Sequence, residues 1–202
     1  RIKLGTESSG GFKNITVTNC IFEHCRGLAL ETVDGGHLED IEISHITMRH
    51  IVNAGIFLRL GARMRSPEGT PAGSMKRIRI SHINAYDVDS RYSSIISGIP
   101  NGIIEDVTFD HIHLYYKGGY TKEDGKRELP EQEKVYPEPW MFGTIPAKGF
   151  YISHAKNISF HHINFYYEKP DGRPLFVTKD VENIRLTDIR ENGENVSVTI
   201  NQ

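Results

Sequence analysis

The chain has 202 residues, of which 24 are basic and 26 are acidic, so its formal net charge is −2. This balance does not indicate the basic surface that nucleic-acid binding uses, and no apolar run approaches the roughly 18 residues that span a bilayer. The length suits one domain, 1–202, with a substantial core. Because the chain opens with Arg1 inside an expected strand, we expect it to be part of a longer protein, and its lack of a signal peptide carries no information.

A ten-residue pattern recurs along the chain and reads polar-polar-apolar-x-apolar-x-(Asn/His/Asp)-apolar-x-apolar. Its period of two predicts a strand with one buried face. The polar residue in the seventh place breaks the alternation and predicts a bend. A recurring unit of this kind indicates a repeat protein. In chain order the copies are Lys13–Phe22, Glu39–Met48, Lys76–Ala85, Glu105–Leu114, Lys156–Phe165 and Glu182–Glu191.

The spacing of the copies predicts the architecture. From Ile15 to Ile184, the first buried apolar residues stand 26, 37, 29, 51 and 26 residues apart, so 26 is the bare repeat and the long steps carry loops at about 61–75 and 116–148. A shorter apolar strand precedes each copy: Ile2–Gly5, Leu28–Glu31, Ile56–Arg59, Ser94–Ser97, Phe150–Ser153 and Leu175–Thr178. Short strands without helices predict an all-β fold, a right-handed parallel β-helix of about six coils with its N-terminal coils missing. Residues 192–202 are expected to form a terminal strand.

A leucine-rich-repeat horseshoe is the competing architecture. Leu38, Ile41 and Ile43 imitate its opening pattern. That repeat next requires Asn where this chain has Ile46, and it needs a helical segment where we expect short strands. We therefore favour the β-helix.

The histidines cluster at one phase of the repeat. Zinc requires ligands that converge on a point, whereas these residues are spread along the repeat axis. We predict a ladder of stacked polar side chains, with no metal and no other cofactor. Cys20 occupies an apolar phase and predicts a buried free thiol, and with Cys25 it makes no disulfide framework. The residues at the bend are Asn19, His45, His82, His111, His162 and Asp188.

The longer loop, 116–148, is charged at first and then aromatic. Its end, Tyr136–Phe142, contains the only tryptophan, Trp140. A loop of this length is uncommon in a compact domain unless it has a function or is disordered. We expect its aromatic end to pack against the body of the protein.

Outward side chains of the short strands are expected to line a groove suited to a polymer. Neighbouring coils should bring Lys3, Glu31 and Arg59 into one column, and Glu7 lies on an adjoining turn. A plain alternative is a surface ion-pair ladder worth about 0–1 kcal/mol per pair. The functional alternative is a cationic groove in which arginines hold the carboxylates of an acidic sugar polymer and a carboxyl group acts on the glycosidic bond. The outward residues of the longer strands predict an ordinary solvated surface: Thr16, Glu42, Arg79, Thr108, Ser159 and Arg185.

A family resemblance covers nearly the whole chain as a fold, and its specific motifs lie in residues 2–32. The turn Gly5–Gly11 and the strand Arg26–Thr32 resemble the G-S-x-x-S-G-G turn and the R-G-I-R-I-K-T strand of glycoside hydrolase family 28, the polygalacturonases and rhamnogalacturonan hydrolases. The resemblance implies the C-terminal part of a β-helix enzyme that cleaves galacturonan or rhamnogalacturonan by inverting acid/base hydrolysis. It also implies a secreted or periplasmic protein that degrades cell-wall pectin.

Two departures from that family shape the site prediction. The family's basic pair falls on Ala29 and Glu31, and its catalytic aspartates precede the first residue of this chain. We therefore expect catalytic carboxylates partly outside the chain, with Glu31 and Glu7 as the candidates within it, and this chain alone need not be active. The expected partner is an acidic polysaccharide or oligosaccharide, held by Lys3, Arg59, Arg63, Arg65, Tyr92 and Tyr151.

Two other functions remain open. A polysaccharide lyase on the same fold would abstract a proton with Lys or Arg, often beside Ca²⁺, but no dense acidic cluster follows the expected groove. A non-catalytic β-helix for carbohydrate binding or adhesion is consistent with the absent aspartates.

Overall fold

The computed structural model describes residues 1–198 and residue 200. The regular structure of the described part is almost entirely β-strand, as predicted, and its two 3₁₀ helices are η1 (Asp124–Lys126) and η2 (Pro139–Phe142). No helix in these residues is long and apolar enough to cross a membrane. The strands are β1 (Lys3–Leu4), β2 (Phe12–Glu23), β3 (Leu28–Thr32), β4 (His37–Ile51), β5 (Ile56–Leu60), β6 (Ser74–Val88), β7 (Ser94–Ser97), β8 (Ile104–Tyr116), β9 (Phe150–Tyr167), β10 (Phe176–Glu191) and β11 (Glu194–Asn195).

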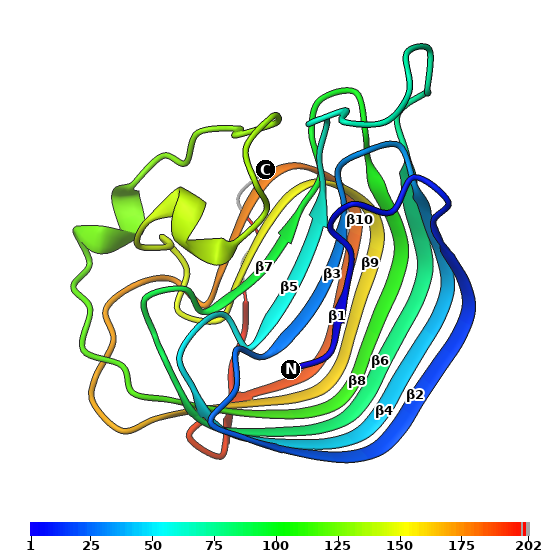
Figure 1. Cartoon of the computed structure of the whole chain (residues 1–202). Helices are drawn as coiled ribbons and strands as arrows, with labels where there is room; N and C mark the ends of the chain where they lie inside the picture. The colour runs from blue at the N-terminus through cyan, green and yellow to red at the C-terminus, as the bar shows by residue number, and fades with distance from the viewer. Residues whose placement is uncertain (199, 201–202) are drawn as a thin grey trace.

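The strands form two rows of parallel pairs that curve toward each other (Figure 1). Short strands β1, β3, β5 and β7 make one row, and long strands β2, β4, β6 and β8 make the other. Strand β9 belongs to both, because Phe150–Ser153 pairs with β7 and Ala155–Tyr167 pairs with β8. Strand β10 pairs in parallel along the whole of β9. The chain thus alternates between the rows, and we call one short strand with the long strand that follows it a layer.

The predicted repeat copies lie in register. Ile15, Ile41, Ile78, Val107, Ile158 and Ile184 are partners from layer to layer, which confirms the phase of all six copies. Residues 28–31 and 56–59, where a leucine-rich repeat needs a helix, are instead strands β3 and β5. That alternative is therefore wrong.

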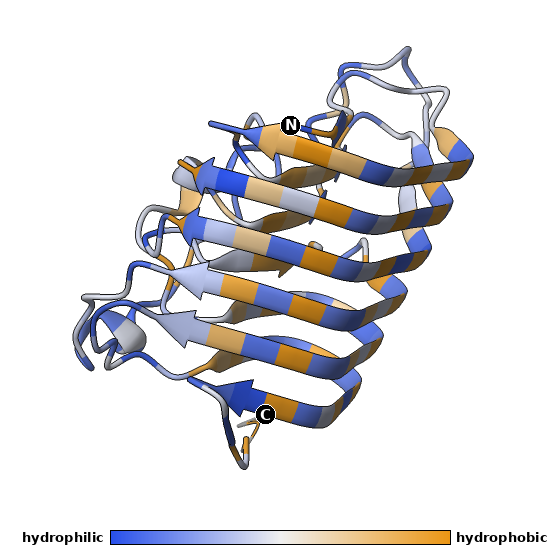
Figure 2. Ribbon diagram, turned by 90° about the horizontal axis from the view of Figure 1, so that it is seen from below, coloured by the Kyte–Doolittle hydropathy of each residue, from blue (hydrophilic) through white to orange (hydrophobic). Residues whose placement is uncertain are grey.

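The core lies between the two rows. Figure 2 shows the long strands with alternating apolar and polar residues. In β4, for example, every apolar residue is buried. Leu30, Ile43, Ile46 and Met48 belong to one continuous apolar cluster that runs through the layers. Burying one face of each strand in this way accounts for the period of two in the sequence.

The long strands bend where the pattern breaks. Every residue in the predicted seventh place has a φ between 51° and 57°, from Asn19 to Asp188. This left-handed conformation is one that Asn, Asp and His adopt more readily than most residues. A second bend five residues earlier was not predicted, and it has the same conformation: Asn14, Asp40, Arg77, Asp106, Asn157 and Asn183.

The loop between β8 and β9, residues 117–149, covers the outer face of the short strands. Met141 and Phe142 pack there against Ala29, Phe57 and Tyr151 in a second apolar cluster. The prediction that the loop packs back is confirmed, except that Trp140 remains 55% exposed. The prediction of an open groove along the short strands is wrong, because the loop occupies that face.

Two smaller predictions need correction. Cys20 is a free thiol but only half-buried, and Cys25 is the buried one. The terminal strand expected at 192–202 is limited to β11, which turns back antiparallel on β10. The rest of that prediction falls partly on residues 199 and 201–202, which lie outside the described residues.

Candidate functional site

Three charged side chains meet where the first short strands lie under the long loop. Lys3 belongs to β1, Glu31 to β3, and Glu138 to the loop, directly before η2. The Lys3 Nζ atom is 2.8 Å from Glu31 Oε2 and 3.4 Å from Glu138 Oε1. Glu31 Oε2 and Glu138 Oε1 are therefore at most 6.2 Å apart. We call Lys3, Glu31 and Glu138 the carboxylate cluster.

Glu31 is fully buried in this cluster. Burial raises the pKa of Glu31, and it outweighs the opposing effects of Lys3 and of the Thr6 hydroxyl, which donates to Oε2 over 2.9 Å. Among the described residues, no group hydrogen-bonds Glu31 Oε1. A side chain at Gly5 would collide with the Glu31 carbonyl oxygen, since its Cβ would lie 2.3 Å away, so only glycine permits this close approach. Glu31 therefore holds a proton more tightly than an ordinary glutamate.

Glu138 has the opposite shift. Burial alone would raise the pKa of Glu138, but the hydrogen bonds and charge of Arg1, together with the charge of Lys3, lower it. The Asn53 amide donates a further hydrogen bond to Oε2 over 3.1 Å. A carboxyl with a raised pKa beside one with a lowered pKa is the arrangement from which acid/base pairs are built.

Lys3 remains an ammonium group. Burial would lower the pKa of Lys3, but the hydrogen bond and charge of Glu31, with the charge of Glu138, raise it. Its Nζ atom also lies 5.0 Å from the centroid of the Tyr136 ring, a cation–π contact. A lysine with a raised pKa is a poor proton acceptor, so Lys3 suits an anion-binding role.

A second group of charges adjoins this cluster. Arg63 Nε donates to Asp34 Oδ1 over 3.1 Å, and Arg63 Nη2 pairs with both Asp34 Oδ2 and Glu7 Oε1. Arg65 Nη1 lies 3.4 Å from the same Glu7 oxygen. The structure thus brings together three residues that we predicted for the site. Arg63 is buried in an ion pair, while Glu7 and Arg65 are exposed, so Glu7 lacks the enclosed environment of Glu31.

Arg59 does not lie free in a groove, as predicted. It is 1% exposed, and its guanidinium donates to the Ser97 hydroxyl over 2.7 Å and to the carbonyls of Gly98, Glu131 and Gln132. Burial lowers the pKa of Arg59 to about 10, against the raising effect of nearby glutamates. These contacts join β5 to the long loop, which is a positioning role.

The expected column of charges is only partly correct. Glu31 and Arg59 are partners in register, but Lys3 is level with Ala29 and reaches Glu31 only through its long side chain. Tyr151 is buried at the wall of a hollow of about 370 Å³ between the loop and β10. Tyr92 is half-buried against the second apolar cluster.

A wider hollow lies on the other face. It is an open groove of about 720 Å³ lined by the outward residues of the long strands, including Thr16, Glu42, Arg79 and Thr108. Its charged residues pair with one another in solvent, as Arg77 Nε does with Asp40 over 2.7 Å. Such a groove can bind a ligand, but it lacks the enclosed carboxyl groups that acid/base chemistry needs.

No protein-family model, curated protein or solved structure matches this chain. The resemblance to glycoside hydrolase family 28 therefore depends on residues 2–32 alone. What the chain does must be argued from its site.

Glu138 is the residue of the cluster that was missed from sequence. It stands between Pro137 and Pro139, just before the segment that packs on the short strands. The available signal was a carboxylate beside a buried aromatic end in a loop predicted to fold back. The repeat pattern carries no information about which layer such a loop reaches.

Proposed function

We propose that this chain takes part in hydrolysing glycosidic bonds of an acidic, pectin-type polysaccharide, galacturonan or rhamnogalacturonan. The observation that carries the proposal is the pair of opposed pKa shifts at Glu31 and Glu138. Glycosidases use one protonated carboxyl as general acid and one carboxylate as base or nucleophile. In this proposal Glu31 is the acid and Glu138 is the base or nucleophile.

Lys3 gives the proposal its preference for an acidic polymer. Its ammonium group now pairs with both glutamates. A lysine side chain rotates readily, so a uronate carboxylate can replace one of these partners. Arg65, which is exposed beside Glu7, supplies a second cation at the rim.

The proposal also covers the handedness and type of the fold, the protein family and the location of the protein. A right-handed parallel β-helix accounts for two rows of strands whose partners always come from the next layer. Membership of glycoside hydrolase family 28, and export to the periplasm or the medium where pectin is met, are proposed on the motifs of residues 2–32.

A lyase is the weaker proposal for this site. Elimination needs a neutral Lys or Arg to remove the proton next to the uronate carboxylate. The pKa of Lys3 is raised and Arg59 is enclosed by hydrogen-bond acceptors, so neither side chain is prepared to act as that base.

The test is release of reducing sugar from polygalacturonate and rhamnogalacturonan by the full chain. Glu31→Gln and Glu138→Gln are each expected to lower kcat by about 10²–10⁴-fold, the usual contribution of a general acid or base. Glu42→Gln, an exposed glutamate in the open groove, is the matched control and should leave kcat unchanged. The fall in rate at alkaline pH reports deprotonation of the general acid. If this fall is lost in Glu31→Gln but kept in Glu138→Gln, Glu31 is the general acid.

Two results would count against the proposal. One is equal activity of the wild type and both cluster variants, and the other is an ultraviolet-absorbing unsaturated product. The stereochemistry adds a sharper test, because retaining enzymes hold their two carboxyl groups about 5–5.5 Å apart and inverting enzymes about 6.5–9.5 Å apart. The family resemblance predicts inversion, and NMR of the first-formed anomer tests this expectation.

A second candidate function is carbohydrate binding without turnover. It is favoured by the open groove, whose outward polar residues repeat from β2 to β9 along the layers. Saturable binding of a pectin oligosaccharide with no product, abolished by Arg79→Ala but retained by Glu31→Gln, would support this function instead.

A further inference from the structure

Four imidazole rings stack along the outer bend of the long strands. They belong to His45, His82, His111 and His162, and the successive ring centroids are 4.7, 5.0 and 4.4 Å apart. This confirms the predicted ladder. The first two steps are nearly parallel, with interplanar angles of 6° and 2°, but the rings of His111 and His162 are tilted by 29°. One step of the ladder therefore differs from the others.

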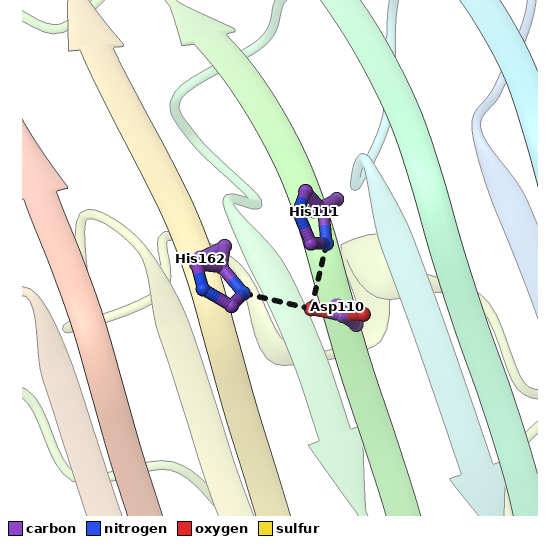
Figure 3. A group of neighbouring side chains, drawn as sticks. All are labelled: Asp110, His111 and His162. Atoms are coloured by element: carbon purple, nitrogen blue, oxygen red, sulfur yellow. Dashed lines mark hydrogen bonds and ion pairs between the residues drawn. The ribbon is translucent and has the colours of Figure 1, made fainter.

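The difference coincides with a carboxylate. The residue before each ladder histidine is Ser44, Ser81, Asp110 or His161, and these four are partners in register. Only the β8 layer places an acid there. Asp110 Oδ1 lies 2.8 Å from His111 Nδ1 and 3.1 Å from His162 Nδ1, so both rings turn a nitrogen toward one oxygen (Figure 3).

The geometry points to a divalent transition-metal site, of the kind that zinc occupies, and we propose that Asp110, His111 and His162 bind such an ion. Their donor atoms all lie within 4.8 Å of one another. Tetrahedral zinc with bonds of about 2.0–2.2 Å places neighbouring ligand atoms about 3.3 Å apart. The observed 2.8 Å and 3.1 Å approach that spacing, and small rotations of two half-exposed rings would complete it.

The ring tilt supports the same conclusion. The lone pair of an imidazole nitrogen lies in the plane of its ring, so two parallel stacked rings cannot direct their lone pairs to one point. The planes of His111 and His162 are 29° from parallel, and both Nδ1 atoms lie within 3.1 Å of the same Asp110 oxygen. Neutral rings protonated at Nε2 would present Nδ1 to the ion, and with three protein ligands water would fill the remaining position.

Such an ion would cross-link two neighbouring layers. His111 lies on β8 and His162 on β9, and the longest loop of the chain separates these strands. An ion that binds only the folded state shifts the folding equilibrium toward that state. The inference does not depend on the proposed hydrolase activity, since the site lies on a different face from Glu31.

The test is titration of the chelator-treated full chain with ZnCl₂, followed by calorimetry and by thermal melting. We expect one ion per chain and a higher Tm with zinc. Asp110→Asn and His162→Ala should each weaken binding by about tenfold or more, because each removes one of three ligands. The matched control is His45→Ala, which removes an exposed ring from the other end of the same ladder and should leave the affinity unchanged.

An independent measurement uses no variant. Long-range ¹H–¹⁵N spectra of the wild type should show zinc-induced shifts at the Nδ1 atoms of two histidines only. No saturation at about 1 mM zinc, unchanged affinity in Asp110→Asn and His162→Ala, or an equal loss in His45→Ala would overturn the proposal. The last outcome would mean that the whole ladder attracts zinc without a defined site.

Discussion

The outer face of the short strands and the outer face of the long strands are built from the same alternation but meet different surroundings. On the short strands the outward residues Ala29, Phe57, Ile95 and Tyr151 are buried beneath the loop 117–149. On the long strands the outward residues Thr16, Glu42 and Arg79 line an open groove. An outward position in a repeat therefore becomes core or surface according to what an insertion elsewhere in the chain covers.

The largest difference in stability between the two faces is expected when one arginine on each face is replaced by alanine. Arg59 and Arg79 both occupy outward positions, on β5 and β6 respectively. Arg59→Ala leaves the acceptors at Ser97, Gly98 and the loop carbonyls without their donor, and we expect it to lower the free energy of unfolding by about 3–5 kcal/mol. Arg79→Ala should change it by no more than about 0.5 kcal/mol.

Urea unfolding of the two variants measures this contrast. Limited proteolysis gives a second readout, because loss of Arg59 should expose the loop 117–149 to cleavage while the layers stay intact. Equal stability of the two variants would mean that the loop is held by its apolar contacts alone.

Much of the fold could be predicted from sequence because it is repeated. The phase of Ile15, Ile41 and their partners, the bend at the seventh place, and the positions of both loops follow from periodicity. The burial of the short strands was also encoded, since segments such as Leu28–Glu31 and Ile56–Arg59 are apolar in three of four positions, as is typical of strands covered on both faces. We instead assigned their outward residues to an open groove.

The candidate site was less predictable because two of its residues lie on the repeated strands and the third lies on an inserted loop. Glu31 and Lys3 stand on strands that the repeat defines, and both were predicted. Glu138 reaches them from a loop more than 100 positions later, and the packing of Met141 and Phe142 with the hydrogen bonds of Arg59 to the loop determine where it arrives. Asp110, by contrast, could be found from the sequence, because it is the only acid in the sixth place of the aligned repeat copies.

A smaller loss of stability is expected from substitutions at the bends of the open face. His82 has a φ of 53°, a conformation that a β-branched residue adopts only with strain. His82→Val should therefore lower the free energy of unfolding by about 1–3 kcal/mol. His82→Asn loses the ring stacking but keeps a side chain that tolerates this φ, so it should lose far less. Urea unfolding of both variants separates the backbone conformation from the stacking, and equal losses would show that the rings provide the stability.

The smallest loss of stability is expected when the ion pairs at the edge of the open face are removed. The hydrogen bond from Ser74, opposed by burial and supported by Arg77, Lys13 and Lys76, lowers the pKa of Glu39 from 4.5 to about 2. The folded state thus prefers the ionised form, so this stabilisation is present above pH 4.5 and is lost as the pH falls toward 2. Its cationic partners are largely solvated, so we expect a contribution of about 1 kcal/mol or less.

Glu39→Gln should therefore flatten the acid side of the plot of Tm against pH, and high salt should reduce the difference from the wild type. Glu42→Gln, on the same strand but outside this ion-pair group, provides the control. If the acid side stays as steep in Glu39→Gln as in the wild type, acid unfolding must begin on the covered face. There Asp34 also has a lowered pKa, because the hydrogen bonds of Arg63 and Arg65 outweigh the raising effect of burial, and its stabilisation would likewise be lost as the pH falls.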